Sequence, residues 1–462
     1  MKCTRLAVAA VLGGCVLAST LLSRGQPGSL DITFNPGSGV GQYLGCIALQ
    51  TNGQILVGGS FNKVNGITNN GVARLNSDGS VDTSFNVGQG PQAGGVNGMA
   101  PQLDGKVVIA GDFATVNNIV NYGVARLRPD ASVDVNFHPA TFNTTSITRL
   151  AVQNDQRILI AGMILFFNGT SGTNFPVARL NTDGSFDSSF AWGTVQNTSM
   201  NKVTDMSLQP NGQILVAVPV ISVNGISRTN VARLNNDGTI DTAFAADPMV
   251  GAPGHVNCVL GLTNGQVLIG GSFDTINGYT RQGIARLNSD GTLDTSFGRP
   301  YSPYDPYVSK MALQPDCKIL IYDNVGSNPH RLNASGQDDA SFSCGTGVNY
   351  SLNTIVVQPD GRILIGGSFT AYNGTNINSI ARLNGDNPPS TGLQFLAANP
   401  YFGTYLQGTL SNTYRIEWTG NPNTASLWTP LFNVMLQTNP QFILDPNPSS
   451  ARRFYRAVQV AP

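Results

Sequence analysis

The feature that most constrains the fold of this sequence is a repeat with a period near 50 residues. The string Ala-Arg-Leu-Asn and its two variants place an arginine at seven positions, separated by 52, 53, 54, 53, 45 and 51 residues. A second string, Asp-x-x-Phe, also occurs seven times, from Phe34 to Phe342, but it starts and stops half a repeat earlier. A fixed period of this length indicates a propeller or a solenoid.

One repeat divides into four short segments with the character of strands, separated by Asn-Gly or Asp-Gly turns, which are strong hairpin signals. In the first copy we expect strands over residues 46–50, 54–61, 71–76 and 80–85. Gly58 and Gly59 in the second strand indicate a close approach of backbones. The stretch 62–70 is expected to be a loop. Copies three, four and six depart from the pattern after their first turn, so we expect different loops there, including one over 166–175.

Seven copies of four antiparallel strands predict an all-β fold, a seven-bladed β-propeller. The last repeat ends at Asp386 without its fourth strand, and residues 29–34 supply such a strand without a repeat before it. We therefore expect the N-terminal strand to pair with the last repeat and close the ring, which removes exposed edges. The composition agrees, because a chain with Glu417 as its only glutamate and six lysines lacks the surface of amphipathic helices.

In six repeats the arginine precedes an aspartate by eight residues, and the two are expected to lie opposite each other across a hairpin. The pairs are Arg74–Asp82, Arg126–Asp134, Arg179–Asp187, Arg233–Asp241, Arg286–Asp294 and Arg331–Asp339. The seventh arginine, Arg382, has no such partner, and Asp31 has no arginine upstream, so closure of the ring predicts that these two pair. Because both faces of a blade are buried, we interpret all seven as structural ion pairs and not as a ligand-binding ring.

The sequence contains no constellation typical of catalysis, metal binding or cofactor binding. His138, His255 and His330 fall in different repeats without metal-ligand spacing, and no nucleophile elbow, P-loop or Cys-x-x-Cys occurs. The Asn-x-Asp-Gly-x-x-Asp spacing is similar to a calcium loop but lacks the bidentate acid at its end, so a hairpin turn is the favoured interpretation. We predict no catalytic, cofactor-binding or metal-binding residue, and we favour a protein that is not an enzyme.

The connector 299–307 is the candidate for ligand contact. It carries Tyr301, Tyr304 and Tyr307 spaced by prolines. Rigid aromatic side chains at a loop tip suit recognition. The alternative is that these tyrosines cover the sixth repeat, which is the shortest.

Residues 1–25 are predicted to be a secretory signal peptide. Lys2 and Arg5 precede an apolar run, and small residues lie at −3 and −1 before Gln26. A lipoprotein site at Cys15 is a less favoured alternative, and after cleavage we expect no transmembrane segment. The remaining cysteines, Cys46, Cys258, Cys317 and Cys344, lie far apart and are interpreted as isolated thiols rather than as a disulfide framework.

The chain is expected to contain two folded parts joined by a linker. The propeller spans 26–386, a Pro-rich linker covers 387–392, and residues 393–462 show short alternating segments without repeat strings. We predict that this last region forms a small β-sandwich-like domain.

The repeat strings over residues 29–386 resemble the delta-60 repeat family of large exported bacterial proteins. The resemblance implies a propeller and no established activity. The net charge of zero provides no basic surface for nucleic acid. We expect a secreted or cell-envelope protein, monomeric and without cofactors, that presents loops to a protein or glycan partner as a binding or scaffold module. The alternative is a hydrolase or lyase that acts on polysaccharide in the central channel.

Overall fold

The computed structural model describes residues 25–139, 146–167, 172–191, 203–223, 226–244, 254–299, 307–323 and 328–386, together with six strands after residue 394. Within these residues the chain is all-β, with many small antiparallel sheets and no helix. The predicted signal peptide and the linker 387–392 lie outside the described residues. In the described part of the chain, nothing forms a helix with the length and apolarity needed to cross a membrane.

Each repeat contains one three-stranded antiparallel sheet whose strands follow one another in chain order. From the first repeat to the last, the sheets are β1 (Tyr43–Leu49), β2 (Ile55–Ser60) and β5 (Val72–Leu75); β7 (Val96–Pro101), β8 (Val107–Gly111) and β11 (Val124–Leu127); β12 (Ser146–Val152), β13 (Ile158–Phe167) and β14 (Gly172–Leu180); β15 (Asp205–Leu208), β16 (Ile214–Val223) and β17 (Ile226–Leu234); β18 (His255–Gly261), β19 (Val267–Ser272) and β22 (Ile284–Leu287); β23 (Val308–Leu313), β24 (Ile319–Asp323) and β25 (Pro329–Leu332); and β26 (Leu352–Val357), β27 (Ile363–Gly367) and β30 (Ile380–Leu383).

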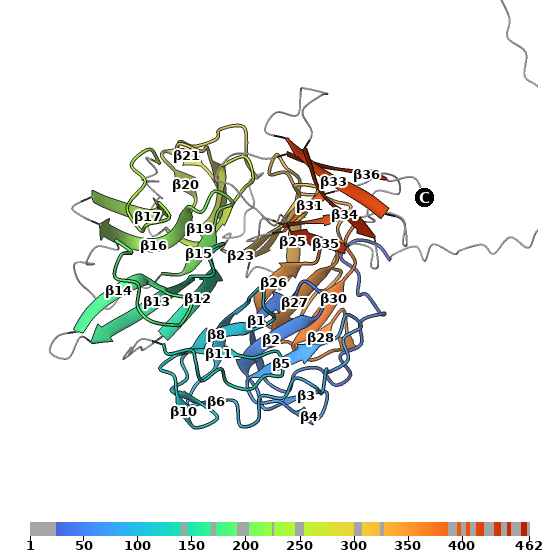
Figure 1. Cartoon of the computed structure of the whole chain (residues 1–462). Helices are drawn as coiled ribbons and strands as arrows, with labels where there is room; N and C mark the ends of the chain where they lie inside the picture. The colour runs from blue at the N-terminus through green and yellow to red at the C-terminus, as the bar shows by residue number, and fades with distance from the viewer. Residues whose placement is uncertain are drawn as a thin grey trace, which may run out of the picture.

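These sheets are arranged around a common centre, with first strands such as β1, β15 and β26 turned toward it (Figure 1). The arrangement is propeller-like, as the period predicts. None of the sheets in the described residues closes on itself. The two ends of the repeat region are in contact, because Leu30 forms a β-bridge with Leu383 and the amide of Asp31 donates to the carbonyl of Arg382 at 2.8 Å.

The prediction of a fourth strand in each repeat is wrong. The structure has a single β-bridge in its place. Val81 bridges Leu75, and the amide of Asp82 still donates to the carbonyl of Arg74 at 2.9 Å. The chain then turns, because Oδ1 of Asp82 accepts hydrogen bonds from the amide and the hydroxyl of Ser84, at 3.0 and 2.6 Å. This local side-chain turn ends the pairing one residue after the bridge.

The predicted loop 62–70 contains a small hairpin instead. Its strands are β3 (Lys63–Val64) and β4 (Ile67–Thr68), joined by Asn65 and Gly66, which both have positive φ. Similar small strands occur in repeats two, five and seven: β6 (Pro91–Gln92), β9 (Thr115–Val116), β10 (Ile119–Val120), β20 (Thr275–Ile276), β21 (Tyr279–Thr280), β28 (Ala371–Tyr372) and β29 (Thr375–Asn376). Repeats three and four differ, as predicted, since β13–β14 and β16–β17 are long hairpins. The predicted loop 166–175 is therefore strand, except for the undescribed residues 168–171.

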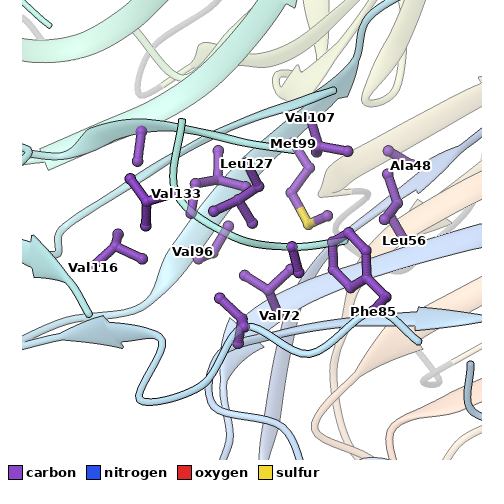
Figure 2. Packing of buried hydrophobic residues seen from close by; sticks show 14 of the residues in the cluster. Ala48, Leu56, Val72, Phe85, Val96, Met99, Val107, Val116, Leu127 and Val133 are labelled. Atoms are coloured by element: carbon purple, nitrogen blue, oxygen red, sulfur yellow. The ribbon is translucent and has the colours of Figure 1, made fainter. Parts of the chain in front are cut away.

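The hydrophobic core lies between neighbouring sheets. The cluster of Figure 2 contains Leu56, Val72 and Phe85 of the first repeat together with Val96 and Val107 of the second, and all five are at most 1% exposed. A corresponding cluster joins the first repeat to the last. It places Leu44 and Val57 with Leu364 and Ile380. Each sheet thus buries both faces, which explains why strands such as β5 are buried along their whole length.

Beyond the repeats, the described residues form two further three-stranded sheets. One contains β31 (Phe395–Ala398), β32 (Gly403–Leu406) and β35 (Gln441–Leu444), and the other β33 (Thr413–Thr419), β34 (Thr429–Met435) and β36 (Phe454–Gln459).

Candidate functional site

The recurring arginine, aspartate and phenylalanine of each repeat meet in one contact cluster. In the first repeat, Nε of Arg74 donates to Oδ2 of Asp82 at 2.8 Å, and the guanidinium lies over the ring of Phe85, 4.6 Å from its centroid. Nη1 of Arg74 donates to the carbonyl of Pro129, in the turn of the next repeat, at 2.9 Å. The arginine therefore joins its own repeat to the following one.

The other six arginines form the same ion pair and the same contact with a phenylalanine ring. Nε donates to Oδ2 at 2.7–2.9 Å in the pairs Arg126–Asp134, Arg179–Asp187, Arg233–Asp241, Arg286–Asp294, Arg331–Asp339 and Arg382–Asp31. Each guanidinium lies 4.4–4.8 Å from the centroid of a phenylalanine ring. All these ionised side chains are at most 16% exposed. Burial alone would raise the pKa of Asp294, but hydrogen bonds from Ser296 and Arg286 outweigh it and lower that pKa to about 2.

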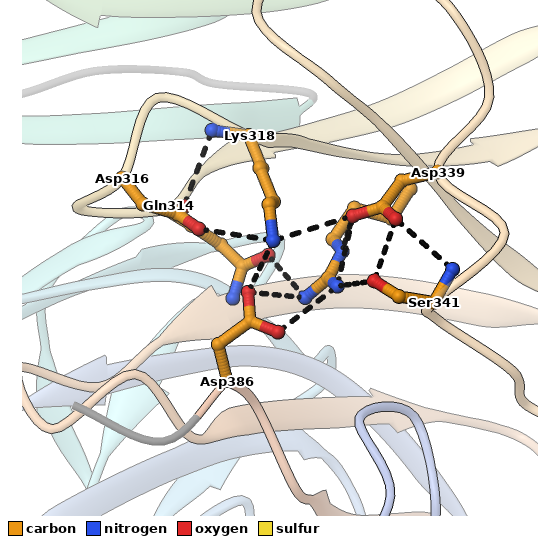
Figure 3. Close-up of polar contacts among 7 residues, drawn as sticks. Gln314, Asp316, Lys318, Asp339, Ser341 and Asp386 are labelled. Carbon is orange, nitrogen blue, oxygen red and sulfur yellow. Dashed lines mark hydrogen bonds and ion pairs between the residues drawn. The ribbon is translucent and has the colours of Figure 1, made fainter. Parts of the chain in front are cut away.

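The sixth repeat uses a carboxylate where the others use a turn carbonyl. Arg331 donates to Asp339 and also, from Nη1, to Asp386 at 2.9 Å, while Nζ of Lys318 donates to Asp386 at 2.7 Å (Figure 3). Asp386 lies at the end of the last repeat. Its carboxylate accepts the hydrogen bond that, in the other repeats, a carbonyl in the hairpin turn of the following repeat accepts. Burial raises its pKa, but Lys318 and Arg331 have the larger combined effect and lower it. Sequence reasoning assigned Asp386 no partner and missed this contact.

The predicted ligand-contact tyrosines are only partly described. Tyr307 is half-buried and forms a β-bridge with Ser272, at the start of the first strand of the sixth repeat. Tyr301 and Tyr304 lie outside the described residues. Within the described ranges, no three histidine, cysteine or acidic side chains are grouped so that they could hold a metal ion.

A cavity of ≈ 210 Å³ lies at the centre of the repeats, and the first strand of every three-stranded repeat sheet contributes to its lining. Each of these strands places one residue at the same position, four residues before a Gln or Leu that follows the strand. These residues, called the central ring below, are Cys46, Gly98, Arg149, Asp205, Cys258, Lys310 and Thr354. The rest of the repeat is similar from copy to copy, whereas the central ring carries a different chemistry in almost every copy.

A β-bulge directly before the central ring aims these side chains. The pairing register shifts at this point in six of the seven first strands. Bulges commonly redirect side chains beside binding sites. The side chains of the bulged residues bind the next repeat: Asn97 Nδ2 donates to the carbonyl of Ile147 at 3.0 Å, and Asn353 Nδ2 donates to that of Leu44 at 2.9 Å. Opposite the first bulge, a Cβ on Gly59 would collide with the Tyr43 carbonyl, so the predicted close approach is confirmed there.

The charges of the central ring are Arg149, Asp205 and Lys310. Nε of Arg149 donates to Oδ1 of Asp205 at 2.6 Å, and the amide of Val259 donates to Oδ2 at 3.0 Å, so both carboxylate oxygens are engaged. Burial lowers the pKa of Arg149, but Asp205 raises it by more. Burial, and secondly the Arg149 charge, lower the pKa of Lys310. The cavity therefore has a net positive charge when Lys310 is protonated.

The four cysteines in the described part of the chain are free thiols, as predicted. Two belong to the central ring, and Sγ of Cys46 lies 3.8 Å from the carbonyl of Val96 in the next repeat. Burial raises the pKa of Cys46 to about 12. The thiol is therefore protonated at neutral pH and acts as a small buried side chain.

The central ring was missed from the sequence, although a signal for it exists. Alignment of the seven copies on the Gln or Leu that follows the first strand would have shown one position that changes from Cys to Gly, Arg, Asp, Lys or Thr among otherwise similar neighbours. Arg149 and Asp205 are 56 residues apart, so no local motif connects them.

A match to a family model agrees with the propeller-like fold. Six segments match a family model described as "Domain of unknown function (DUF5122) beta-propeller", at residues 50–85, 102–137, 153–190, 209–244, 262–297 and 358–386. The comparison with curated proteins gave no match.

Among solved structures, the chain is similar to virginiamycin B lyase from Staphylococcus aureus, at 13% identity and a TM-score of 0.44, over 67% of this chain and 90% of that one. It is similar to the WD40 beta propeller domain of Doa1, at 10% identity and a TM-score of 0.47, over 78% and 97%. It is also similar to the extracellular domain of a hybrid two component system of B. thetaiotaomicron, at 13% identity and a TM-score of 0.48, over 84% and 46%.

Proposed function

We propose that this protein is an exported, non-catalytic binding protein built on a closed seven-bladed β-propeller, with its ligand site at the central cavity. A protein or glycan partner would bind at the face where this cavity opens. Closure is supported by the contacts between the first and last repeats. Asn353 donates to the carbonyl of Leu44 in the way that Asn97 donates to that of Ile147. The contact between the last and the first repeat is therefore the same as a contact between two consecutive repeats.

The proposal rests on where polar side chains occur in the repeat. Some repeat positions carry the same polar residue in every copy, and others carry residues that differ between copies. The shared arginines and aspartates are engaged with each other, and the arginines also contact the neighbouring repeat. The varied polar residues instead belong to the central ring, at the only position where all seven repeats contribute to one cavity among the described residues. A fold stabilised by its shared residues leaves such a position available for recognition.

We further propose that residues 1–25 direct export, that the repeats are delta-60 repeats, and that 393–462 form a separate small β-sandwich-like domain. The apolar N-terminal run supports the first, and the Ala-Arg-Leu-Asn and Asp-x-x-Phe strings support the second. The third is supported by two three-stranded sheets after the linker.

The experiment is a glycan array and a pull-down with the chain that begins at Gln26. Any ligand found is re-measured with Lys310→Met, which changes the central ring, and with a Tyr301→Ala/Tyr304→Ala variant, which changes the connector. Loss of affinity in Lys310→Met alone supports the cavity as the site. Loss only in the tyrosine variant would contradict it. Cleavage products in the mass spectrum of a bound polysaccharide would establish a hydrolase or lyase and overturn the non-catalytic assignment.

A further inference from the structure

The central cavity has more positive than negative charge, and its one carboxylate is already engaged. Among the described lining residues, Arg149, Asp205 and Lys310 are the charged groups. Asp205 uses one oxygen for Arg149 and the other for the amide of Val259. Asp205 forms its ion pair with Arg149, and Lys310 forms none with a described carboxylate. One unit of positive charge remains without an engaged counter-charge.

Two donors in the cavity have no partner among the described residues. Arg149 uses Nε for Asp205 and Nη1 for the carbonyl of Thr148, at 2.8 Å, which leaves Nη2. Nζ of Lys310 makes no hydrogen bond or ion pair with a described residue, although Arg149 and Asp205 act on it electrostatically. Lys310 is half-buried in the wall of the cavity. A cation without a counter-charge in a partly desolvated site is energetically unfavourable. An anion whose oxygens accept from Nη2 of Arg149 and from Nζ of Lys310 would offset this desolvation penalty.

The other residues that line the cavity restrict the kind of molecule that can carry the anionic group. Asn97, Asn353 and Thr354 present polar groups, and Met99 and Met311 present apolar ones. The volume of ≈ 210 Å³ equals that of roughly seven waters at ~30 Å³ each, which is below the usual size of a site for drug-like molecules. The cavity is thus suited to a small molecule that carries both hydroxyl groups and an acid.

We propose that the central cavity binds the carboxylate of a small hydroxylated acid, such as a sugar acid, between Nζ of Lys310 and the guanidinium of Arg149. This inference rests on the proposed binding function and names the chemical class of its ligand. The carboxylate forms charge-assisted hydrogen bonds with both cations. Because Nδ2 of Asn97 and of Asn353 already donates to a backbone carbonyl, the Oδ1 atoms of these two residues are the groups that would accept from the hydroxyl groups of the acid.

The test is isothermal titration of the chain that begins at Gln26 with D-glucuronate, and with D-glucose as the neutral partner of the same ring. We expect glucuronate to bind and glucose to bind at least about tenfold more weakly, because glucose cannot form the charge-assisted hydrogen bonds of the carboxylate. Lys310→Met should weaken glucuronate by a similar factor. Lys63→Met, which removes an exposed lysine of β3, is the matched control and should leave the affinity unchanged.

Thermal melting separates loss of the site from loss of the fold. Lys310 has no partner among the described residues, so Lys310→Met is expected to keep or raise the melting temperature. If Lys310→Met lowers the melting temperature, the affinity is measured with Lys310→Gln instead. Equal affinities for glucuronate and glucose, or equal effects of the Lys310 and Lys63 substitutions, would overturn the assignment. If an array ligand or captured partner binds while glucuronate does not, the binding function stands and the acid assignment fails.

Discussion

Nε of Arg382 donates a hydrogen bond to Oδ2 of Asp31 at 2.7 Å, although the two residues are 351 positions apart in the chain. Both side chains are 4% exposed. Arg362 adds a second ion pair to the same carboxylate at 3.1 Å. This contact joins the segment before the first repeat to the last strand of the last repeat.

Replacing Asp31 with Ala is expected to destabilise the fold by roughly 3–5 kcal/mol, because it leaves a buried guanidinium without its counter-charge. Urea unfolding measures the free energy. Asp78→Ala is the control, since Asp78 is an exposed turn residue that accepts from Ser80 and should cost far less. An Asp31→Ala effect no larger than that of Asp78→Ala would mean that the terminal contact contributes little to stability.

The first turn of each repeat predicts an unusual stabilising substitution. In five copies this turn has glycine with φ of 81–85°, but Gln156 in the third copy and Cys317 in the sixth occupy it with φ of 65°. A residue with a Cβ is strained in this region, whereas glycine is not. Cys317→Gly should therefore raise the free energy of unfolding by about 1 kcal/mol.

Gly53→Ala is the reverse substitution at the equivalent turn position of the first repeat, and the same urea titration measures its effect on stability. No atom lies within 4 Å of a Cβ built on Gly53, so its expected loss of stability arises from backbone strain alone. Opposite signs for the two substitutions support the interpretation. A destabilising Cys317→Gly would show that the thiol makes a contact worth more than the strain.

Acid should unfold the repeats through their paired aspartates. The pKa values of Asp294 and Asp339 are lowered to about 2 in the folded chain, below the ordinary 3.8. Stability from these groups is present above ~pH 4 and is lost as the pH falls from ~4 to ~2, at about 2 kcal/mol for each group. Urea unfolding at a series of pH values should show this fall. Asp294→Asn should make it shallower, whereas Asp104→Asn, at a carboxylate 54% exposed, should not.

Chelation is expected to leave stability unchanged, because the aspartates of the hairpin turns are engaged in hydrogen bonds within their turns. Oδ1 of Asp78 accepts from the amide of Ser80 at 2.9 Å and from its hydroxyl at 2.7 Å. Differential scanning calorimetry with and without EDTA measures the effect. A melting temperature that falls by many degrees in EDTA and is restored by calcium would show that these turns bind the ion.

The exported protein is expected to begin near Gln26. Intact-mass analysis of material recovered outside the cytoplasm measures this directly. A mass that includes Met1 would contradict cleavage, and a diacylglycerol on Cys15 would establish the lipoprotein alternative. The charged residues before the apolar run and the small residues after it are the physical basis of the expectation.

Much of the fold could be predicted because its determinants recur at a fixed period. The pairing of Arg74 with Asp82 depends on one hairpin, and hairpin geometry is set by local turn residues such as Gly79, which has φ of 92°. The fourth strand was overpredicted for a local reason too. Apolar alternation favours a strand, but the side chain of Asp82 binds Ser84 and turns the chain before a second pair can form.

The sequence by itself determined the all-β class, the period and the ion pairs, because each depends on residues within one repeat or on an exact repetition of them. Only the tertiary structure brought Arg149, Asp205 and Lys310 to one cavity. These residues come from three different repeats, and their positions are set by the bulges before Arg149 and Lys310 and by sheet-to-sheet packing. The repeat can mark the varying position, but it does not show that the seven residues at this position line one cavity, which arises only where seven strands meet in space.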